Sequence, residues 1–151
     1  MNWLERKIPP LLLLFGCAAL MWQLAQWLPT PGWTAGNPWS GLLVLAGALV
    51  SVSGVLTFRL ARTTANPIQL DRSSSLVQHG IYRLSRNPMY LGFVFALTGF
   101  AWWLGSLSAC VGILVLVVWL NRFQITPEER ALQQIFGEPY LQYCQRVRRW
   151  L

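Results

Sequence analysis

Long runs of apolar residues alternate with shorter polar segments along this chain. Two of the runs, Pro10–Leu28 and Trp39–Phe58, contain no charged residue. At about 1.5 Å per residue, each run can form a helix that crosses a hydrocarbon core roughly 30 Å thick. The pattern therefore predicts membrane helices over about residues 10–28 and 39–59.

The third apolar stretch is longer, because no residue from Met89 to Asn121 is charged. One straight helix of this length would be too long for a bilayer, and Gly105-Ser106-Leu107-Ser108 supplies turn residues near its middle. We expect two antiparallel helices, over about 89–104 and 107–124. Each is short for a full crossing, so local bilayer thinning and a partly re-entrant hairpin both remain compatible with the sequence.

These elements predict one domain over residues 1–151: an all-α, polytopic membrane protein. It would have four transmembrane helices, the last two forming a C-terminal helical hairpin pair, and a cytoplasmic helical tail. A signal peptide is the alternative for the first run, since Arg6 and Lys7 precede it. The length of the run, and Trp22 and Trp27 within it, favour a retained helix.

Composition supports the membrane assignment. Hydrophobic residues make up 54% of the chain and charged residues 11%, against about 25% charged in a typical soluble domain. The net charge of +7 would suit either nucleic acid or an anionic membrane surface. The uninterrupted apolar runs favour the membrane, so we expect membrane lipids and no nucleic acid as partners.

The positions of the basic residues predict an orientation. All Lys and Arg residues fall within 6–7, 59–86 and 122–149. Four crossings place these segments on one side, and the positive-inside rule makes that side the cytoplasm. We therefore expect both termini in the cytoplasm, with cytoplasmic segments 60–88 and 125–151. The small size and short loops favour a bacterial or archaeal inner membrane.

The C-terminal tail has the pattern of two short helices. Thr126 as an N-cap, followed by Pro127 and the acidic pair Glu128-Glu129, is typical of a helix start. Gly137 predicts a break before the second helix. The acidic pair has a simpler interpretation, since carboxylates in a first helical turn complement the helix dipole. The cysteines show no metal-ligand spacing, so no metal site is expected.

Polar chemistry is concentrated in Gly80–Gly92, directly before and within the third apolar stretch. Asn87 and Pro88 suit the N-cap and first position of a helix. Arg86, Tyr82 and Tyr90 would then surround a helix N-terminus, which favours an anionic group. The alternative is an interfacial anchor, because Arg and Tyr are common where a helix meets lipid headgroups.

These segments together resemble a known family. The sequence SLVQHGIYRLSRNPMYLG, followed after an apolar hairpin by EERALQQIFGEPYLQYCQRVRRW, is similar to the isoprenylcysteine carboxyl methyltransferases. That family is related to the phospholipid methyltransferases. The resemblance covers roughly residues 63–150 and joins two separate motifs in the expected order.

The resemblance implies an integral membrane methyltransferase that uses S-adenosylmethionine (SAM) and acts on a lipophilic or prenylated substrate. In the family the cofactor is enclosed by the loop before the hairpin and the C-terminal helices. The positions that match cofactor-binding residues are Ser74, Ser75, Leu76, Val77, Tyr82, Asn87, Pro88, Met89, Tyr90 and Glu128.

Two positions depart from the family pattern. Asn87 stands where the family has histidine, which keeps hydrogen-bonding capacity but not a titratable ring. Gln124 stands where eukaryotic members have a substrate-binding arginine, and Arg122 is two residues away. We take Arg122 and Arg86 as candidate catalytic cations and Glu129 as the candidate base. O-, N- and S-methylation all remain open, as does a non-catalytic, lipid-binding accessory protein.

Overall fold

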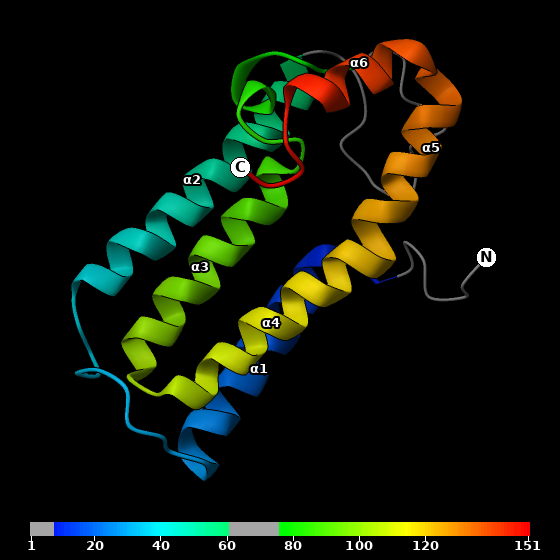
Figure 1. Cartoon of the computed structure of the whole chain (residues 1–151). Helices are drawn as coiled ribbons and strands as arrows, with labels where there is room; N and C mark the ends of the chain where they lie inside the picture. The colour runs from blue at the N-terminus through cyan, green and yellow to red at the C-terminus, as the bar shows by residue number, and fades with distance from the viewer. Residues whose placement is uncertain (1–7, 61–75) are drawn as a thin grey trace.

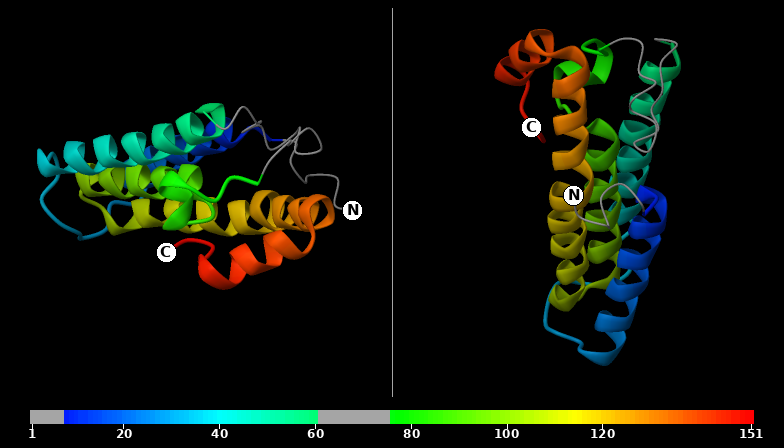
Figure 2. Two further views of the ribbon diagram at one scale, coloured as in Figure 1. Left: turned by 90° about the horizontal axis from the view of Figure 1, so that it is seen from above. Right: turned by 90° about the vertical axis from the view of Figure 1, so that its right-hand side faces the viewer.

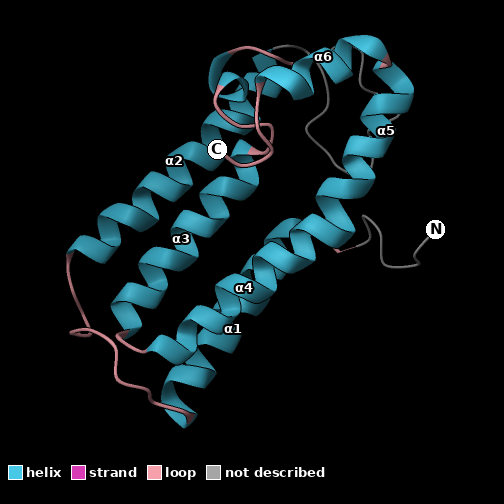
Figure 3. Cartoon of the chain, viewed as in Figure 1, coloured by secondary structure: helices cyan, strands magenta, loops and turns pink. Residues whose placement is uncertain are grey.

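The computed structural model describes residues 8–60 and 76–151, and within these residues it is helical without strands (Figures 1 and 3). The first three long helices are α1 (Pro10–Trp27), α2 (Trp39–Leu60) and α3 (Pro88–Leu104). Their bounds lie within one residue of the predicted ones, which confirms the all-α prediction. Each long helix pairs its backbone N–H and C=O groups internally, as an apolar environment requires.

Three helical stretches are long and apolar enough to cross a membrane: Pro10–Trp27, Trp39–Leu60 and Leu107–Phe136. The apolar helix α3 is shorter, with 17 residues, or about 26 Å at the usual rise. It runs antiparallel to α2 and to α4 (Cys110–Trp119), as Figure 1 shows. Against the four membrane spans predicted from the sequence, the structure thus has three helical stretches long enough to cross a membrane and the shorter apolar helix α3.

The helix of residues 107–124 does not end where it was predicted to end. From α4 the chain continues through a π-helical turn, Leu120–Ile125, directly into α5 (Thr126–Phe136). Thr126 is therefore not an N-cap: its backbone is helical, and its hydroxyl donates to the Asn121 carbonyl oxygen at 2.7 Å. Pro127 explains the wide turn, because a proline lacks an N–H and its ring crowds the carbonyl four residues earlier.

Helices α2 and α3 pack with their backbones in close contact. Gly47 of α2 faces Gly92 of α3, and a Cβ on either residue would overlap the backbone of the other helix. Further along, a Cβ on Gly99 would lie 2.7 Å from the Ser40 carbonyl oxygen. The Ser51 hydroxyl also donates to the Met89 carbonyl oxygen at 2.9 Å. Small residues at these positions let the two helices approach closely, as is typical of membrane helix pairs.

At one end of the bundle, polar contacts tie the α1–α2 connection to the α3–α4 turn. The Thr30 N–H donates to the Ser106 hydroxyl at 3.1 Å, and the Ser108 N–H donates to the Thr30 hydroxyl at 2.7 Å. Gly105 ends α3 with a positive φ of 69°, a conformation that favours glycine. Helix α3 therefore ends at the position where the sequence predicts a turn.

The opposite end carries the described arginines apart from Arg122, which lies in the π turn, and we call it the basic end. It holds the close of α2, the 3₁₀ turn Gly80–Arg83, the start of α3, and the tail helices α5 and α6 (Glu138–Arg146). Gly137, with φ of 56°, separates α5 from α6, as predicted. Figure 2 shows α6 turning away from the axis of α5 at this end of the bundle. The described arginines of the segments 59–86 and 130–149 thus gather at one end of the bundle.

The α2–α3 contact predicts that Gly47→Ala will destabilise the protein by about 1–3 kcal/mol, because the added methyl must force the helices apart. Thermal unfolding in detergent would measure the change. Gly41→Ala is the matched control in the same helix, since a Cβ there meets no described atom within 4 Å. It should be neutral or stabilising by up to about 1 kcal/mol. Equal melting temperatures for the two variants would contradict the close packing.

Candidate active site

The sequence motifs converge at the basic end. The segment 76–87, the start of α3, the start of α5, and α6 with the residues after it all meet there. Of the predicted cofactor-binding strip, Val77 is buried and Leu76 packs against a cluster of Tyr140, Tyr143 and Val147. Ser74 and Ser75 lie outside the described residues.

One hydrogen bond joins the two motifs directly. Tyr90, in the first turn of α3, donates its hydroxyl to Glu128 Oε1 of α5 at 2.5 Å. Tyr90 is 5% exposed and belongs to the main apolar core. A hydrogen bond between a buried hydroxyl and a carboxylate is charge-assisted and therefore strong. The structure therefore brings together two predicted cofactor-binding residues that lie far apart in sequence.

Tyr82 is held next to this pair by contacts on both its ring and its backbone. Its ring packs edge-on against Phe58 of α2 with centroids 5.0 Å apart. Its carbonyl oxygen accepts a hydrogen bond from the Tyr143 hydroxyl of α6 at 2.7 Å. Burial, with smaller contributions from Tyr143 and Glu128, raises the pKa of Tyr82 well above its ordinary value. Its hydroxyl therefore stays neutral at physiological pH and can donate a hydrogen bond.

Two further tyrosines extend this neutral, polar lining. Burial is the main cause that raises the pKa of Tyr140, and the nearby Glu129 carboxylate adds to the effect. Burial also raises the pKa of Tyr143, while the positive charge of Arg86 opposes the shift. Neither residue was among the predicted site residues. Their spacing of three along α6 puts both on one face of that helix, but the sequence alone does not say what that face meets.

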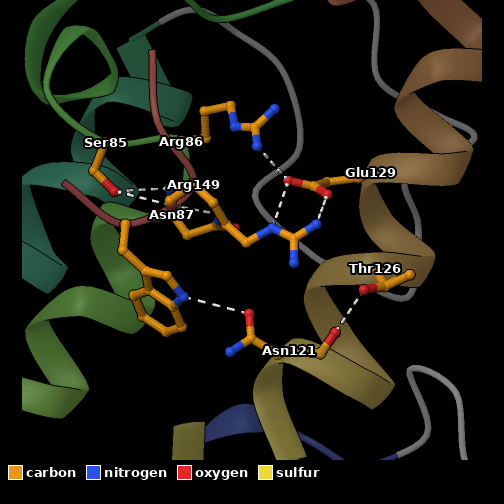
Figure 4. Close-up of polar contacts among 8 residues, drawn as sticks. Ser85, Arg86, Asn87, Asn121, Thr126, Glu129 and Arg149 are labelled. Carbon is orange, nitrogen blue, oxygen red and sulfur yellow. Dashed lines mark hydrogen bonds and ion pairs between the residues drawn. The ribbon is translucent and has the colours of Figure 1, made fainter. Parts of the chain in front are cut away.

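Glu129, the residue after Glu128, forms a three-residue ionic cluster with Arg86 and Arg149 (Figure 4). Arg86 Nη2 lies 3.1 Å from Glu129 Oε1, and Arg149 binds both carboxylate oxygens of Glu129 at 3.2 and 2.5 Å. The Glu129 side chain is 18% exposed. Two predicted catalytic residues, Arg86 and Glu129, are thus in contact with each other. Glu129 would have to release a guanidinium partner before it could accept a proton as a base.

Asn87 occupies the N-cap position of α3, as predicted, and Pro88 follows as the first helical residue. The Asn87 side chain makes no capping bond to α3. Its Nδ2 donates instead to the Arg149 carbonyl oxygen at 2.9 Å, while its backbone N–H donates to the Ser85 hydroxyl at 3.1 Å. Met89 follows, half-buried against Gly54 of α2. The amide of Asn87 therefore binds the C-terminal segment of the chain.

The remaining predicted cation, Arg122, lies in a different environment. It is exposed, and its guanidinium carbon sits 5.7 Å from the ring centroid of its neighbour Phe123. No contact in the described part of the chain joins it to Arg86 or Glu129. Gln124 is 1% exposed and donates from Nε2 to the Ile8 carbonyl oxygen at 2.7 Å. The position that carries an arginine in eukaryotic members thus contributes to fixing the start of α1 here.

Arg149 is the site residue that sequence reasoning missed most clearly. The basic run at the end of the tail contributes none of the predicted site residues. Nothing in the local pattern distinguishes Arg149 from its neighbour Arg148, which is exposed. Within residues 8–60 and 76–151, no group of three or more His, Cys, Asp or Glu could hold a metal ion. The assembled chemistry consists of carboxylates, guanidinium groups and neutral hydroxyls.

Comparison with known proteins shows the family of the chain. The family model of the phospholipid methyltransferases matches residues 38–139. Protein-S-isoprenylcysteine O-methyltransferase A of Arabidopsis thaliana is 33% identical over 107 residues, which cover 70% of this chain and 54% of that protein. The enzyme of the same name from Rattus norvegicus is 31% identical over 118 residues, covering 70% of this chain and 39% of the rat protein.

An uncharacterised protein of Haemophilus influenzae is 41% identical over 63 residues, which cover 42% of this chain and all of that protein. The chain spans about half the length or less of the isoprenylcysteine O-methyltransferases that it matches. No solved structure matches it. The matched region takes in α2, α3, α4, the π turn and α5, and so includes the first motif and the first half of the second. The chain belongs to the phospholipid methyltransferase family, and the isoprenylcysteine O-methyltransferases that its two motifs resemble are among its relatives.

Proposed function

We propose that this protein is a SAM-dependent methyltransferase that acts on a lipophilic acceptor at the cytoplasmic face of a bacterial inner membrane. Carboxyl O-methylation of an isoprenylcysteine-like substrate is the reaction we propose first. The observation that carries the proposal is the hydrogen bond between Tyr90 and Glu128. It joins the two motifs into one site at the basic end, next to apolar helices that could admit a lipid.

The chemical groups of the site suit this cofactor. A carboxylate such as Glu128 can hold an ammonium or hydroxyl group, and neutral tyrosines can donate hydrogen bonds. Arg86 offers a fixed positive charge for a carboxylate. Leu76, Val77, Pro88 and Met89 would supply apolar contacts, and Ser74 and Ser75 would supply hydroxyls. Asn87 would contribute through Oδ1, because its Nδ2 is bound to the Arg149 carbonyl oxygen.

In the proposed reaction the protein itself needs to carry out little covalent chemistry. The bound cofactor supplies an electrophilic methyl group, and a carboxylate acceptor is already nucleophilic. The residues must align donor and acceptor and exclude water, and such alignment can account for much of the rate enhancement. The location of the site at the end of an apolar bundle favours an acceptor with a lipid chain, whose reactive head would reach the basic end.

A second candidate reaction is N-methylation of a lipid amine. It is favoured by Gln124, a buried and neutral residue that offers no positive charge for a carboxylate acceptor. An amine must lose a proton before or during methyl transfer, so this reaction needs a base. Glu129 would have that role, after releasing Arg86 or Arg149.

Calorimetric titration of SAM into detergent-purified protein tests the cofactor site. Wild-type protein should bind saturably, and Glu128→Gln and Tyr90→Phe should each weaken binding about tenfold or more, because charged hydrogen bonds contribute roughly 1.5–3 kcal/mol. Glu138→Gln is the matched control, since it removes the same charge from an exposed position at the start of α6. Folded wild-type protein that does not bind SAM would instead support a lipid-binding accessory protein.

Transfer of a radiolabelled methyl group in proteoliposomes identifies the acceptor. A prenylated cysteine analogue, phosphatidylethanolamine and a lipophilic thiol would be compared under the same conditions. We expect labelling of the prenylated cysteine, with release of the label by mild alkali, because methyl esters hydrolyse and methylamines do not. Alkali-stable label on phosphatidylethanolamine would establish the second candidate reaction, and label on the thiol would exclude both.

Cysteine labelling in spheroplasts tests the orientation. In a background with Cys17, Cys110 and Cys144 replaced by serine, Thr34→Cys should react with a membrane-impermeant maleimide added from outside. Gln133→Cys should react only after the membrane is permeabilised. Both positions are exposed and lie at opposite ends of the bundle. The reverse pattern would place the proposed active site on the other face of the membrane.

A further inference from the structure

The residues after α6 form a non-helical segment, 147–150, which we call the strap. Val147 has extended backbone angles, with φ of −124° and ψ of 129°, so the helix ends there. The strap then runs beside the residues that precede α3, where the Arg86 N–H donates to the Arg148 carbonyl oxygen at 3.0 Å. The strap is therefore attached by its backbone to the segment that leads into Tyr90.

The carbonyl oxygen of Arg149 strengthens this attachment. It accepts hydrogen bonds from Asn87 Nδ2 at 2.9 Å and from the Ser85 hydroxyl at 3.4 Å (Figure 4). Ser85 and Asn87 are both buried. Buried polar groups are costly to leave without partners, so these bonds hold the strap firmly against the start of α3.

The side chains of the strap bind the other side of the site. The Arg149 guanidinium binds both oxygens of Glu129 in α5. The Trp150 Nε1 donates to Asn121 Oδ1 in the π turn at 3.3 Å, and the Trp150 ring packs against the main core. One residue, Arg149, is thus bonded through its backbone to the start of α3 and through its side chain to α5.

The start of α3 and α5 need such a link because the two helices separate at the basic end. Figure 1 shows α5 leading away from α3, with α6 crossing back between them. Two side-chain links between the described residues of these elements are Tyr90–Glu128 and Arg86–Glu129. Both end on the first turn of α5, one residue apart. The position of Glu129 therefore determines where Glu128 lies relative to Tyr90.

We propose that Arg149 is a positioning residue, and that the strap sets the geometry of the Tyr90–Glu128 pair. This inference rests on the proposed function, since that pair is the proposed core of the cofactor site. In this proposal Arg149 acts through Glu129 and not by binding the cofactor. It fixes Glu129 through a two-pronged, planar contact, which a flexible lysine ammonium cannot reproduce. Loss of the contact would let α5 shift relative to α3.

The test compares Arg149→Ala with Arg148→Ala in the full chain. The two variants remove the same charge from adjacent residues, but only Arg149 binds Glu129, whereas the Arg148 side chain is exposed. Calorimetry with SAM should show about tenfold or greater weakening for Arg149→Ala, because small displacements within a site are costly. Arg148→Ala should bind within about twofold of wild type. Arg149→Lys should bind more weakly than wild type and more tightly than Arg149→Ala.

A double-mutant cycle separates positioning from general stability. If Arg149 acts through Glu129, the effects of Arg149→Ala and Glu129→Gln on the dissociation constant of SAM should not add. Trp150→Phe is the second probe of the strap, because it removes the bond to Asn121 and keeps an aromatic ring in the core. It should weaken SAM binding about two- to fivefold without lowering the unfolding temperature as far as Arg149→Ala does.

The outcomes distinguish this inference from the proposed function. Wild-type protein that does not bind SAM would remove the proposed function and this inference together. Wild-type binding with unchanged affinity in Arg149→Lys and Trp150→Phe would overturn the role of the strap alone. Equal weakening by Arg149→Ala and Arg148→Ala would also overturn it, because the effect would then follow from net charge. In the methyl-transfer assay, the KM for SAM should rise more than kcat falls.

Discussion

The acidic pair at the start of α5 is the contact point on which the basic end depends. Glu128 receives the Tyr90 hydroxyl, and its neighbour Glu129 receives Arg86 and Arg149. Consecutive helical residues point in different directions, about 100° apart, so the pair can hold two different elements at once. It connects the start of α3 on one side to the residues after α6 on the other. Such an acidic pair could serve only to complement a helix dipole. In this protein it holds together the polar elements of the basic end.

The π turn puts this pair where it is needed. A regular α-helix through residues 120–125 would rotate Glu128 and Glu129 about the helix axis by part of a turn, because a π turn holds more residues per turn. The inserted turn is stabilised by the Thr126 hydroxyl, which donates to the Asn121 carbonyl oxygen. It also leaves Asn121 Oδ1 available to Trp150. One local irregularity near Pro127 therefore affects the orientation of the acidic pair and the anchoring of the C-terminal segment. Such turns occur often at functional sites.

Local patterns predicted most of the fold and part of the site. Apolar runs and glycines gave α1, α2, α3, the turn at Gly105 and the break at Gly137, because these depend on nearby residues alone. The end of α4 was predicted wrongly, since a Thr-Pro-Glu-Glu start is normally strong and only the continuous helix overrides it here. The family resemblance predicted that Tyr90 and Glu128, from two separate motifs, belong to one site, and the structure places them in contact. The role of Arg149 was not predicted, because its partner lies 20 residues away and Arg148 has the same local sequence environment.

The glycine contact between α2 and α3 has a mechanical consequence. Where two backbones are in direct contact, no side chains lie between them that could change rotamer and allow sliding. The α2–α3 pair is therefore expected to be rigid. Tyr90 and Asn87 lie at the start of α3 in this pair, whereas Glu128 and Glu129 lie on α5, which leads away from α3. The two sides of the proposed site therefore differ in how firmly the surrounding helices hold them, and a ligand that enters it is expected to displace α5 and α6 more readily than Tyr90 and Asn87.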